Sequence, residues 1–195
     1  MNVAAVVLAA GASRRLGQPK QVLPLDGATV LDATLAVALL SGCEQVVVVL
    51  GNSADVVRSE VDLTGVEVVE NHDYGEGCAT SIRTALTALT PEAEGIVLLL
   101  GDQPRVRVAT IATLTAAASG HAVGVCEYDD GLGHPLWFDR AMFGALETMH
   151  GDKAVWKLVD AEGPEADVIR VRTEGPVPRD VDTWADYAAM LADQS

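Results

Sequence analysis

Apolar runs alternate with segments of helical periodicity along the 195 residues of this chain. The runs that begin at Val3, Gln45 and Glu94 contain almost no polar side chains, a pattern typical of parallel strands buried on both faces. Shorter strands are predicted at residues 66–69, 122–126 and 168–171. Helices are predicted at residues 29–40, 54–60, 82–89, 106–118, 140–149 and 151–158, and after Thr183. This alternation predicts an α/β fold, a single-domain Rossmann-like three-layer sandwich over residues 1–195 with a mostly parallel sheet.

Several predicted helices carry an apolar face or a marked start. Their apolar faces comprise Leu31, Leu35, Ala38 and Leu39, then Ile82, Ala85, Leu86 and Leu89, and finally Trp184, Tyr187, Ala188 and Leu191. Thr183 with Asp186 three residues later fits the capping-box pattern at a helix start. Pro104 stands where the helix at 106–118 is expected to begin. The turn-rich residues 128–133 and the segment from His134 to Phe138 are expected to lead into the next helix.

Three loops are expected to meet at one edge of the sheet, because ligands of open α/β sheets bind outside the carboxyl ends of the strands. They are residues 10–20, 71–81 and 101–104. The first is rich in small residues and carries Arg14, Arg15 and Lys20. Backbone N–H groups in such a loop can form an anion-binding concavity. We therefore predict a phosphate-binding loop; the alternative is a surface loop with solvated charges.

Two aspartates are candidates for metal binding. Asp102 follows a fully apolar strand and would face the same crevice as the first loop. Mg²⁺ that accompanies a nucleoside triphosphate is usually held by one or two carboxylates and phosphate oxygens. Asp182 is the second candidate, with Asp180 close to it. The alternatives are a turn aspartate for Asp102, a helix-cap aspartate for Asp182 and an ordinary exposed lysine for Lys20.

The histidines and cysteines indicate little further chemistry. His134 lies between Gly133 and Pro135 and is either a contact for a second substrate or a structural histidine. The three cysteines, Cys43, Cys78 and Cys126, have no zinc-site spacing and no CxxC pair, which fits thiols in a reducing compartment. A reactive thiol at Cys78, in its glycine-rich loop, is an alternative.

Charge and hydropathy exclude some partners. The formal net charge is −15, from 13 Lys and Arg against 28 Asp and Glu, which argues against a nucleic-acid partner. No run approaches the ~20 apolar residues that span a membrane. The first apolar run has no basic region before it, unlike a secretory signal. A cytoplasmic protein without a membrane partner is expected.

The order and spacing of five motifs resemble the molybdenum cofactor cytidylyltransferase family, the MocA-like nucleotidyltransferases related to MobA. The motifs are Leu8-Ala9-Ala10-Gly11-Ala12-Ser13-Arg14-Arg15-Leu16-Gly17 with Pro19-Lys20, which is similar to LAAGxSxRxGxxK; Asn71-His72-Asp73-Tyr74-Gly75-Glu76-Gly77 with Ser81; Gly101-Asp102-Gln103-Pro104; Gly133-His134-Pro135; and Asp180-Val181-Asp182-Thr183. The resemblance covers nearly the whole chain and implies the fold of nucleotide-diphospho-sugar transferases.

The resemblance also implies a reaction. A CMP group would pass from CTP to the phosphate of the molybdenum-bound molybdopterin cofactor, releasing pyrophosphate, and a molybdenum hydroxylase would receive the product. Lys20, Arg15 and Asp102 would be catalytic, and Asp102 and Asp182 would hold Mg²⁺. The implied nucleotide-binding residues are Leu8, Ala9, Ala10, Gly11, Ala12, Ser13, Arg14, Arg15, Lys20, Gly77, Ser81 and Gly101. The implied acceptor-binding residues are Asn71, Gly75, Gln103, Pro104, His134 and Asp152.

One stretch departs from the family pattern. Relatives carry a GDxGAR-like sequence near the acceptor, whereas this chain has Gly151-Asp152-Lys153-Ala154-Val155-Trp156. An arginine that would pair with acceptor phosphate is replaced by an aromatic residue. Two alternatives therefore stay open: transfer from GTP or another nucleotide to a different phosphorylated acceptor, and a non-catalytic protein that delivers cofactor to a molybdoenzyme.

Overall fold

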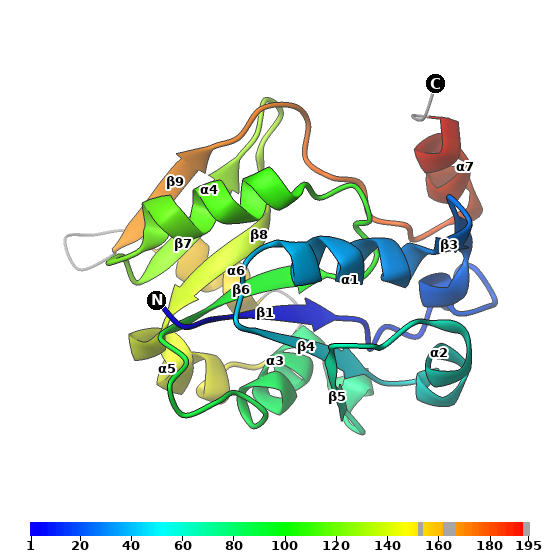
Figure 1. Cartoon of the computed structure of the whole chain (residues 1–195), viewed down its shortest axis with the longest axis horizontal. Helices are drawn as coiled ribbons and strands as arrows, with labels where there is room; N and C mark the ends of the chain where they lie inside the picture. Colours follow the sequence, from blue (N-terminus) through cyan, green and yellow to red (C-terminus); the bar gives the residue numbers. More distant parts are fainter. Residues whose placement is uncertain (152–153, 162–166, 193–195) are drawn as a thin grey trace.

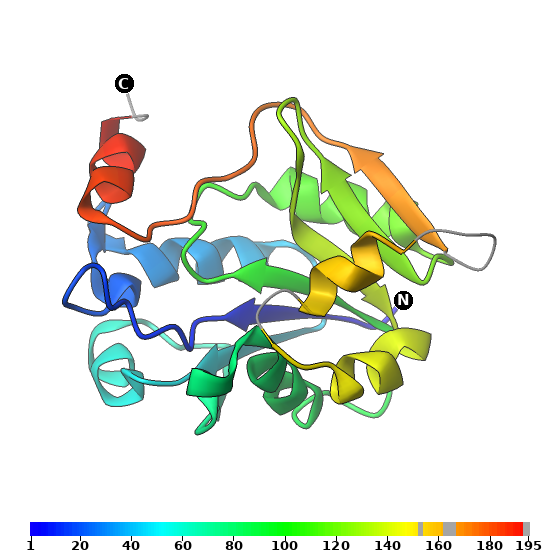
Figure 2. The same cartoon turned by 180° about the vertical axis from the view of Figure 1, so that it is seen from behind.

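The computed structural model describes residues 1–151, 154–161 and 167–192 and has three layers, with a twisted sheet between two sets of helices (Figures 1 and 2). Within these ranges the central sheet has seven strands in the order β5-β4-β1-β6-β8-β7-β9. They are β1 (Val3–Leu8), β4 (Gln45–Leu50), β5 (Glu67–Glu70), β6 (Gly95–Leu100), β7 (Val123–Glu127), β8 (Leu132–Asp139) and β9 (Val168–Arg172). Only β8 is antiparallel to its neighbours. The predicted α/β class with a mostly parallel sheet is confirmed.

Helices cover both faces of this sheet. They are α1 (Val30–Leu40), α2 (Ala54–Glu60), α3 (Cys78–Leu86), α4 (Val108–Ala118), α5 (Phe143–Thr148), α6 (Ala154–Val159) and α7 (Trp184–Ala192). Helices α1, α2 and α4 pack on the face that buries Ala5 and Val7 of β1. Helices α3, α5 and α6 pack on the face that buries Ala4 and Val6. The central strands are thus buried on both faces, as their continuous apolar sequences indicate.

A third, smaller core joins the two ends of the described chain. It contains Leu16, Leu23, Leu25, Val30, Val181 and Met190. These residues come from the first loop, the small hairpin β2 (Pro24–Leu25) and β3 (Ala28–Thr29), α1, the segment before α7, and α7 itself. In addition, the Val181 N–H donates to the Asp102 carbonyl over 3.0 Å. The segment before α7 is therefore held against both the first loop and the end of β6.

Capping boxes begin the first and last helices. In α1 the Thr29 and Asp32 side chains each bond the other residue's backbone N–H, and Thr183 and Asp186 repeat the arrangement at α7, as the sequence predicts. The predicted apolar faces are wrong at four positions: Leu39 is 41%, Trp184 51% and Leu191 39% exposed, and Ala188 is exposed as well. The α7 side chain that packs into the third core is instead that of Met190, which is buried.

The segment from Leu132 to Asp139 corrects the sequence analysis, which expected a loop leading into a helix. It forms β8, which pairs antiparallel with β6 and with β7. Its pairing with β7 shifts between Val125 and Cys126, opposite His134 and Pro135. A proline has no N–H for a sheet ladder and is tolerated at such an irregularity.

Other element ends move by a few residues. Helix α4 begins at Val108, four residues after Pro104, and the predicted helix at 140–149 is a 3₁₀ turn, Arg140–Met142, followed by α5. No disulfide joins the three cysteines, all of which lie in the described part of the chain. Across that part, every helix is too short or too polar to cross a membrane.

Candidate active site

The three predicted loops meet beside the carboxyl ends of β1 and β6 and enclose a cavity of about 250 Å³. Its walls are formed by Leu8, Ala9, Ala10, Gly11, Lys20, Gln21, Tyr74, Gly77, Cys78, Ser81, Leu100, Gly101, Asp102 and Asp180. The predicted nucleotide-binding positions at residues 8–11, Lys20, Gly77, Ser81 and Gly101 all contribute. By contrast, the predicted residues 12–15 of the same loop do not line the cavity.

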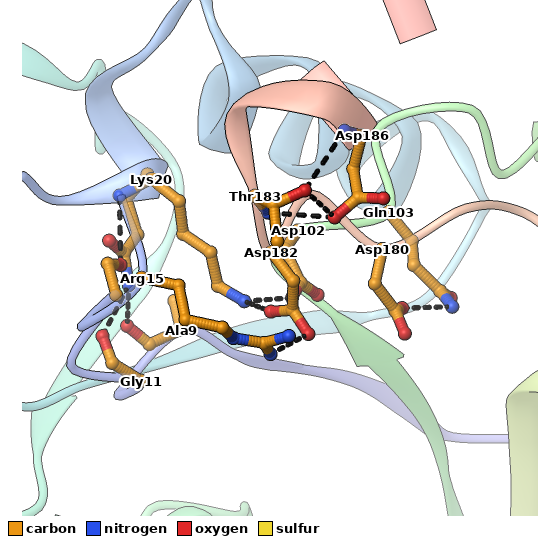
Figure 3. Close-up of polar contacts among 12 residues, drawn as sticks. Ala9, Gly11, Arg15, Lys20, Asp102, Gln103, Asp180, Asp182, Thr183 and Asp186 are labelled. Carbon is orange, nitrogen blue, oxygen red and sulfur yellow. Dashed lines mark hydrogen bonds and ion pairs between the residues drawn. The ribbon is translucent and has the colours of Figure 1, made fainter. Parts of the chain in front are cut away.

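Lys20 joins two carboxylates from distant parts of the chain (Figure 3). Its ammonium Nζ donates to Oδ2 of Asp102 and, over 2.8 Å, to Oδ1 of Asp182. The other oxygen of Asp182 accepts from Nη2 of Arg15 over 2.5 Å. The Lys20 side chain is 13% exposed, whereas that of Arg15 is 66% exposed. The structure thus brings together the four residues predicted to be catalytic or metal-binding.

These contacts perturb the charged groups. Burial lowers the pKa of Lys20, but the Asp102 and Asp182 carboxylates outweigh it, and the net pKa is raised. Burial acts to raise the pKa of Asp182, but hydrogen bonds and charge from Lys20 and Arg15 leave it lowered. Partial burial, followed by the negative charge of Asp102, raises the pKa of Asp180. At neutral pH Lys20 is therefore cationic and Asp182 anionic.

The first loop is braced from inside by Gln21, a residue that sequence analysis missed. Gln21 is 2% exposed, and its Nε2 donates to the carbonyls of Ala9 over 2.7 Å and Gly11 over 3.2 Å. The Ser13 hydroxyl accepts from the Lys20 N–H over 3.0 Å. The sequence shows Gln21 only as a polar residue next to Lys20. That its side chain points inward depends on the fold of the loop.

Close packing behind this loop requires a small residue at position 51. A Cβ on Gly51 would lie 2.7 Å from the Ala10 carbonyl oxygen and 2.8 Å from the Ala10 Cβ. Such distances are too short for real carbon atoms, so the end of β4 approaches the loop only as glycine. The position of Ala10 in the cavity wall is therefore fixed from behind.

The second loop is organised by Asn71, which is buried. Its amide donates to the hydroxyls of Thr80 over 2.8 Å and Ser81 over 2.9 Å, near the start of α3. Gly77 has a φ of 106° where α3 begins, a conformation that favours glycine. Asn71 thus positions the helix that contributes Ser81 and does not itself line the cavity; Gly75 is also absent from the cavity wall.

The other predicted acceptor residues in the described part of the chain do not line this cavity. Gln103 and Pro104 are buried, and Gln103 donates to the Pro178 carbonyl over 3.1 Å and to Asp180 over 2.8 Å. His134 in β8 is buried with its ring edge-to-face on Trp156, at 5.6 Å between centroids. Asp152 lies outside the described residues.

The chemistry of the donor set fits a hard divalent cation. Asp102 and Asp182 offer carboxylate oxygens on either side of one cationic nitrogen, and Asp180 lines the same cavity. The described residues include no group of three or more His, Cys, Asp or Glu side chains placed to hold a metal ion without help. Magnesium sites that rely on one or two carboxylates take their other ligands from substrate phosphates and water.

A family profile described as the MobA-like NTP transferase domain matches residues 5–167. The chain belongs to this MobA-like NTP transferase family. The resemblance to MobA-related nucleotidyltransferases that the sequence motifs predict is confirmed. The match includes Lys20 and Asp102 and ends before Asp182, which contacts Lys20 from the segment before α7.

Two named relatives of this MobA-like chain differ in reaction. Nicotine blue oxidoreductase of Paenarthrobacter nicotinovorans is 31% identical over 198 aligned residues, which cover 97% of this chain and 96% of that protein. Molybdenum cofactor cytidylyltransferase of Escherichia coli strain K12 is 30% identical over 104 residues, 53% of each chain. The individual reaction of this family member therefore has to be argued from its site.

A solved structure shares both fold and much of the sequence. The crystal structure of Rv0371c from Mycobacterium tuberculosis H37Rv matches with a TM-score of 0.92 and 47% identity, covering 98% of both chains. A structure of Rv0371c in complex with manganese matches with a TM-score of 0.88 and 44% identity, covering 98% of this chain and 99% of that one. A divalent cation thus binds to that similar protein.

Proposed function

We propose that this MobA-like nucleotidyltransferase moves a CMP group from CTP to the phosphate of the molybdenum-bound molybdopterin cofactor and releases pyrophosphate. The observation that carries the proposal is the contact of Lys20 with both Asp102 and Asp182 at a cavity built from the small-residue first loop. Nucleotidyl transfer requires positive charge and metal-binding carboxylates at one place, and this arrangement offers both.

Charge at the site supports a role for a divalent cation. Asp102, Asp180 and Asp182 contribute three formal negative charges, and Lys20 and Arg15 contribute two positive ones. A triphosphate approaching this acidic group alone would be repelled. We propose that Asp102 and Asp182 hold Mg²⁺, which when bound would neutralise phosphate charge.

The chain's own residues would then act mainly by positioning. Lys20 would balance charge on the α-phosphate and the leaving pyrophosphate, and Arg15, more exposed, would meet the outer phosphates. The small residues 8–11 would let backbone N–H groups approach the phosphate chain. A phosphate monoester is already largely ionised at neutral pH, with a second pKa of about 6, so the acceptor needs no catalytic base. In-line positioning and charge neutralisation are the main requirements of such a reaction.

Three alternatives have a stated basis. The altered stretch at residues 151–156 keeps open a different nucleotide or phosphorylated acceptor, and it also keeps open a non-catalytic role in delivering cofactor to a molybdenum hydroxylase. The printed name of the Paenarthrobacter relative introduces a third, oxidoreduction. The ion-paired Lys20, Asp102 and Asp182 favour phosphate chemistry over hydride transfer, which needs no such cluster.

Pyrophosphate release tests the proposal. The protein is incubated with Mg²⁺ and each of CTP, GTP, ATP and UTP, with and without molybdenum-loaded molybdopterin. Lys20→Ala is compared with Lys157→Ala, which removes the same charge from an exposed position on α6. A parallel reaction with nicotine blue and reduced nicotinamide cofactors tests the oxidoreductase alternative.

We expect release with CTP that depends on the pterin and is abolished by Lys20→Ala but not by Lys157→Ala. Pyrophosphate release with another nucleotide would show that this nucleotide, and not CTP, is the donor, and would keep the transferase assignment. CTP binding without pterin-dependent release would point to another acceptor or to delivery. Oxidation of the nicotinamide cofactor by nicotine blue, without release of pyrophosphate, would overturn the proposed function.

A further inference from the structure

A second cavity is lined by the segment that leads into α7 and by residues at the start of α4. Figures 1 and 2 show this segment passing near that end of α4. Its volume is about 540 Å³, within the range of about 300–1,000 Å³ common for small-molecule sites. It is lined by Arg105, Val106, Arg107, Thr110, Tyr128, Glu174, Gly175, Pro176, Val177, Pro178, Arg179 and Met190. None of these residues lines the candidate active site.

Positive charge gathers at this cavity in a strongly acidic protein. Three of the chain's 13 basic residues, Arg105, Arg107 and Arg179, line it, although the formal net charge is −15. One acidic residue, Glu174, stands among the described lining residues. Arginines that lack a carboxylate partner and lie beside apolar walls are candidates for binding an anion.

The three guanidinium groups differ in how far the protein itself satisfies them. Arg105 pairs with Asp26 at 3.3 Å, and Arg107 donates to the backbone carbonyl of Glu174 over 2.5 Å. Arg179 has no hydrogen bond or ion pair with any described residue. A backbone carbonyl carries no full charge, so among the described residues neither Arg107 nor Arg179 has a carboxylate partner.

The other walls are apolar. Val106 and Met190 are 4% and 2% exposed, and Pro176 and Val177 extend this surface. The hydroxyl of the buried Tyr128 already donates to the His134 carbonyl over 2.7 Å, so Tyr128 offers the cavity its ring. Binding sites for small organic molecules combine such apolar walls with a few directed polar groups.

We infer that this second cavity binds a small organic anion, a carboxylate or phosphate group attached to a flat or aliphatic body. The oxyanion would lie against Arg107 and Arg179, whose planar guanidinium groups match carboxylate and phosphate oxygens. The apolar body would pack on Tyr128 and Val106. The inference rests on the residues of this cavity and holds whether or not the chain transfers CMP.

Backbone amide NMR of the full chain tests this assignment. The probes are phenyl phosphate and phenylacetate, with benzyl alcohol as the uncharged control and inorganic phosphate as the control without an apolar body. Changes in chemical shift at the amides of Thr110 and Gly175 on addition of a probe report binding in the second cavity. Shifts at Gly11 and Ser81 report the candidate active site, so binding there is recognised separately.

Three variants identify the groups that bind. We expect Arg107→Gln and Arg179→Gln each to weaken binding of the preferred oxyanion by about tenfold or more, since each removes a charge-assisted hydrogen bond. Arg58 on α2 forms an exposed ion pair with Glu70 of β5. Arg58→Gln removes the same charge there and should leave binding unchanged. Arg179 is exposed and makes no hydrogen bond or ion pair with the described residues, so its substitution breaks no such contact that could imitate the expected loss.

The outcomes separate the possible ligands. Tighter binding of phenyl phosphate assigns a phosphate ester, and tighter binding of phenylacetate assigns a carboxylate. Shifts at Thr110 and Gly175 that benzyl alcohol reproduces, or that survive both arginine substitutions, would overturn the inference. So would the absence of shifts there at millimolar probe.

Discussion

Acidification to pH 5 is expected to destabilise this fold through one buried imidazole, that of His134. Burial lowers its pKa to about 4, from the ordinary value of 6.5. Because the pKa is lower in the folded chain than in the unfolded one, the unfolded chain takes up a proton first as the pH falls. The stability that depends on the neutral ring is complete above about pH 6.5 and is lost as the pH falls towards 4.

The size of the loss follows from the two pKa values. At pH 5 nearly every unfolded chain carries a protonated imidazole, whereas only about a tenth of folded chains do. The proton-binding factor, 1 + 10^(pKa − pH), is about thirtyfold larger for the unfolded chain than for the folded one. This ratio corresponds to about 2 kcal/mol of unfolding free energy at 25 °C. Between pH 7.5 and pH 6.8 the same calculation gives a loss of only about 0.2 kcal/mol.

Urea unfolding at pH 7.5 and pH 5 measures this loss. His134→Phe keeps an aromatic ring against Trp156 and removes the titrating group. Other groups titrate equally in both proteins, so the wild type should lose about 2 kcal/mol more than the variant. An equal loss in the two proteins would refute the reasoning, as would an NMR titration that places the imidazole pKa in the folded chain near 6.5.

Two further predictions concern the candidate active site and the core. Lys20→Ala and Asp102→Ala should each lower turnover by on the order of 10²–10³ with unchanged circular dichroism; near-normal turnover by folded Asp102→Ala would reject the proposed metal site. Gly95→Ala should lower the unfolding free energy by about 1–3 kcal/mol, because its Cβ would lie 2.2 Å from Trp137. Gly75→Ala, which meets nothing within 4 Å, is the matched control in urea unfolding, and equal stability of the two variants would contradict this packing argument.

The layered fold and the meeting of three loops were predictable because they depend on local patterns. Continuous apolar runs identify strands buried on both faces, and the loops that follow parallel strands must emerge at the same edge of the sheet. The capping box at Thr183 and Asp186 was also visible, since it depends on residues three apart. These signals need no knowledge of long-range contacts.

Strand β8 was not predictable in the same way. Its segment contains Gly133 and Pro135, which favour turns, and it is buried on both faces, so no alternation of polar and apolar residues marks it. The irregular pairing opposite Cys126 removes the usual objection to a proline inside a sheet. The two unpaired residues, His134 and Pro135, belong to β8, but the irregularity is defined by pairing with β7, which the segment's own sequence does not show.

The orientation of α7 and the details of the site depend on tertiary contacts. The sequence predicts Trp184 and Leu191 on the apolar face of α7, but the third core buries Met190 and leaves both of them exposed. The contact of Lys20 with Asp182 joins residues 162 positions apart. The sequence marks such residues as candidates, but their pairing follows from how the segment before α7 docks on the end of β6.

The docking of that segment has a consequence for synthesis of the protein on the ribosome. Lys20 is made 162 residues before Asp182, yet Arg15, Lys20 and Asp182 form one ion-paired group. A growing chain that already contains β1 and β6 still lacks this group until residue 182 has left the exit tunnel. The segment before α7 therefore completes the ion-paired group, and Lys20 gains its second carboxylate only after residue 182 has been made.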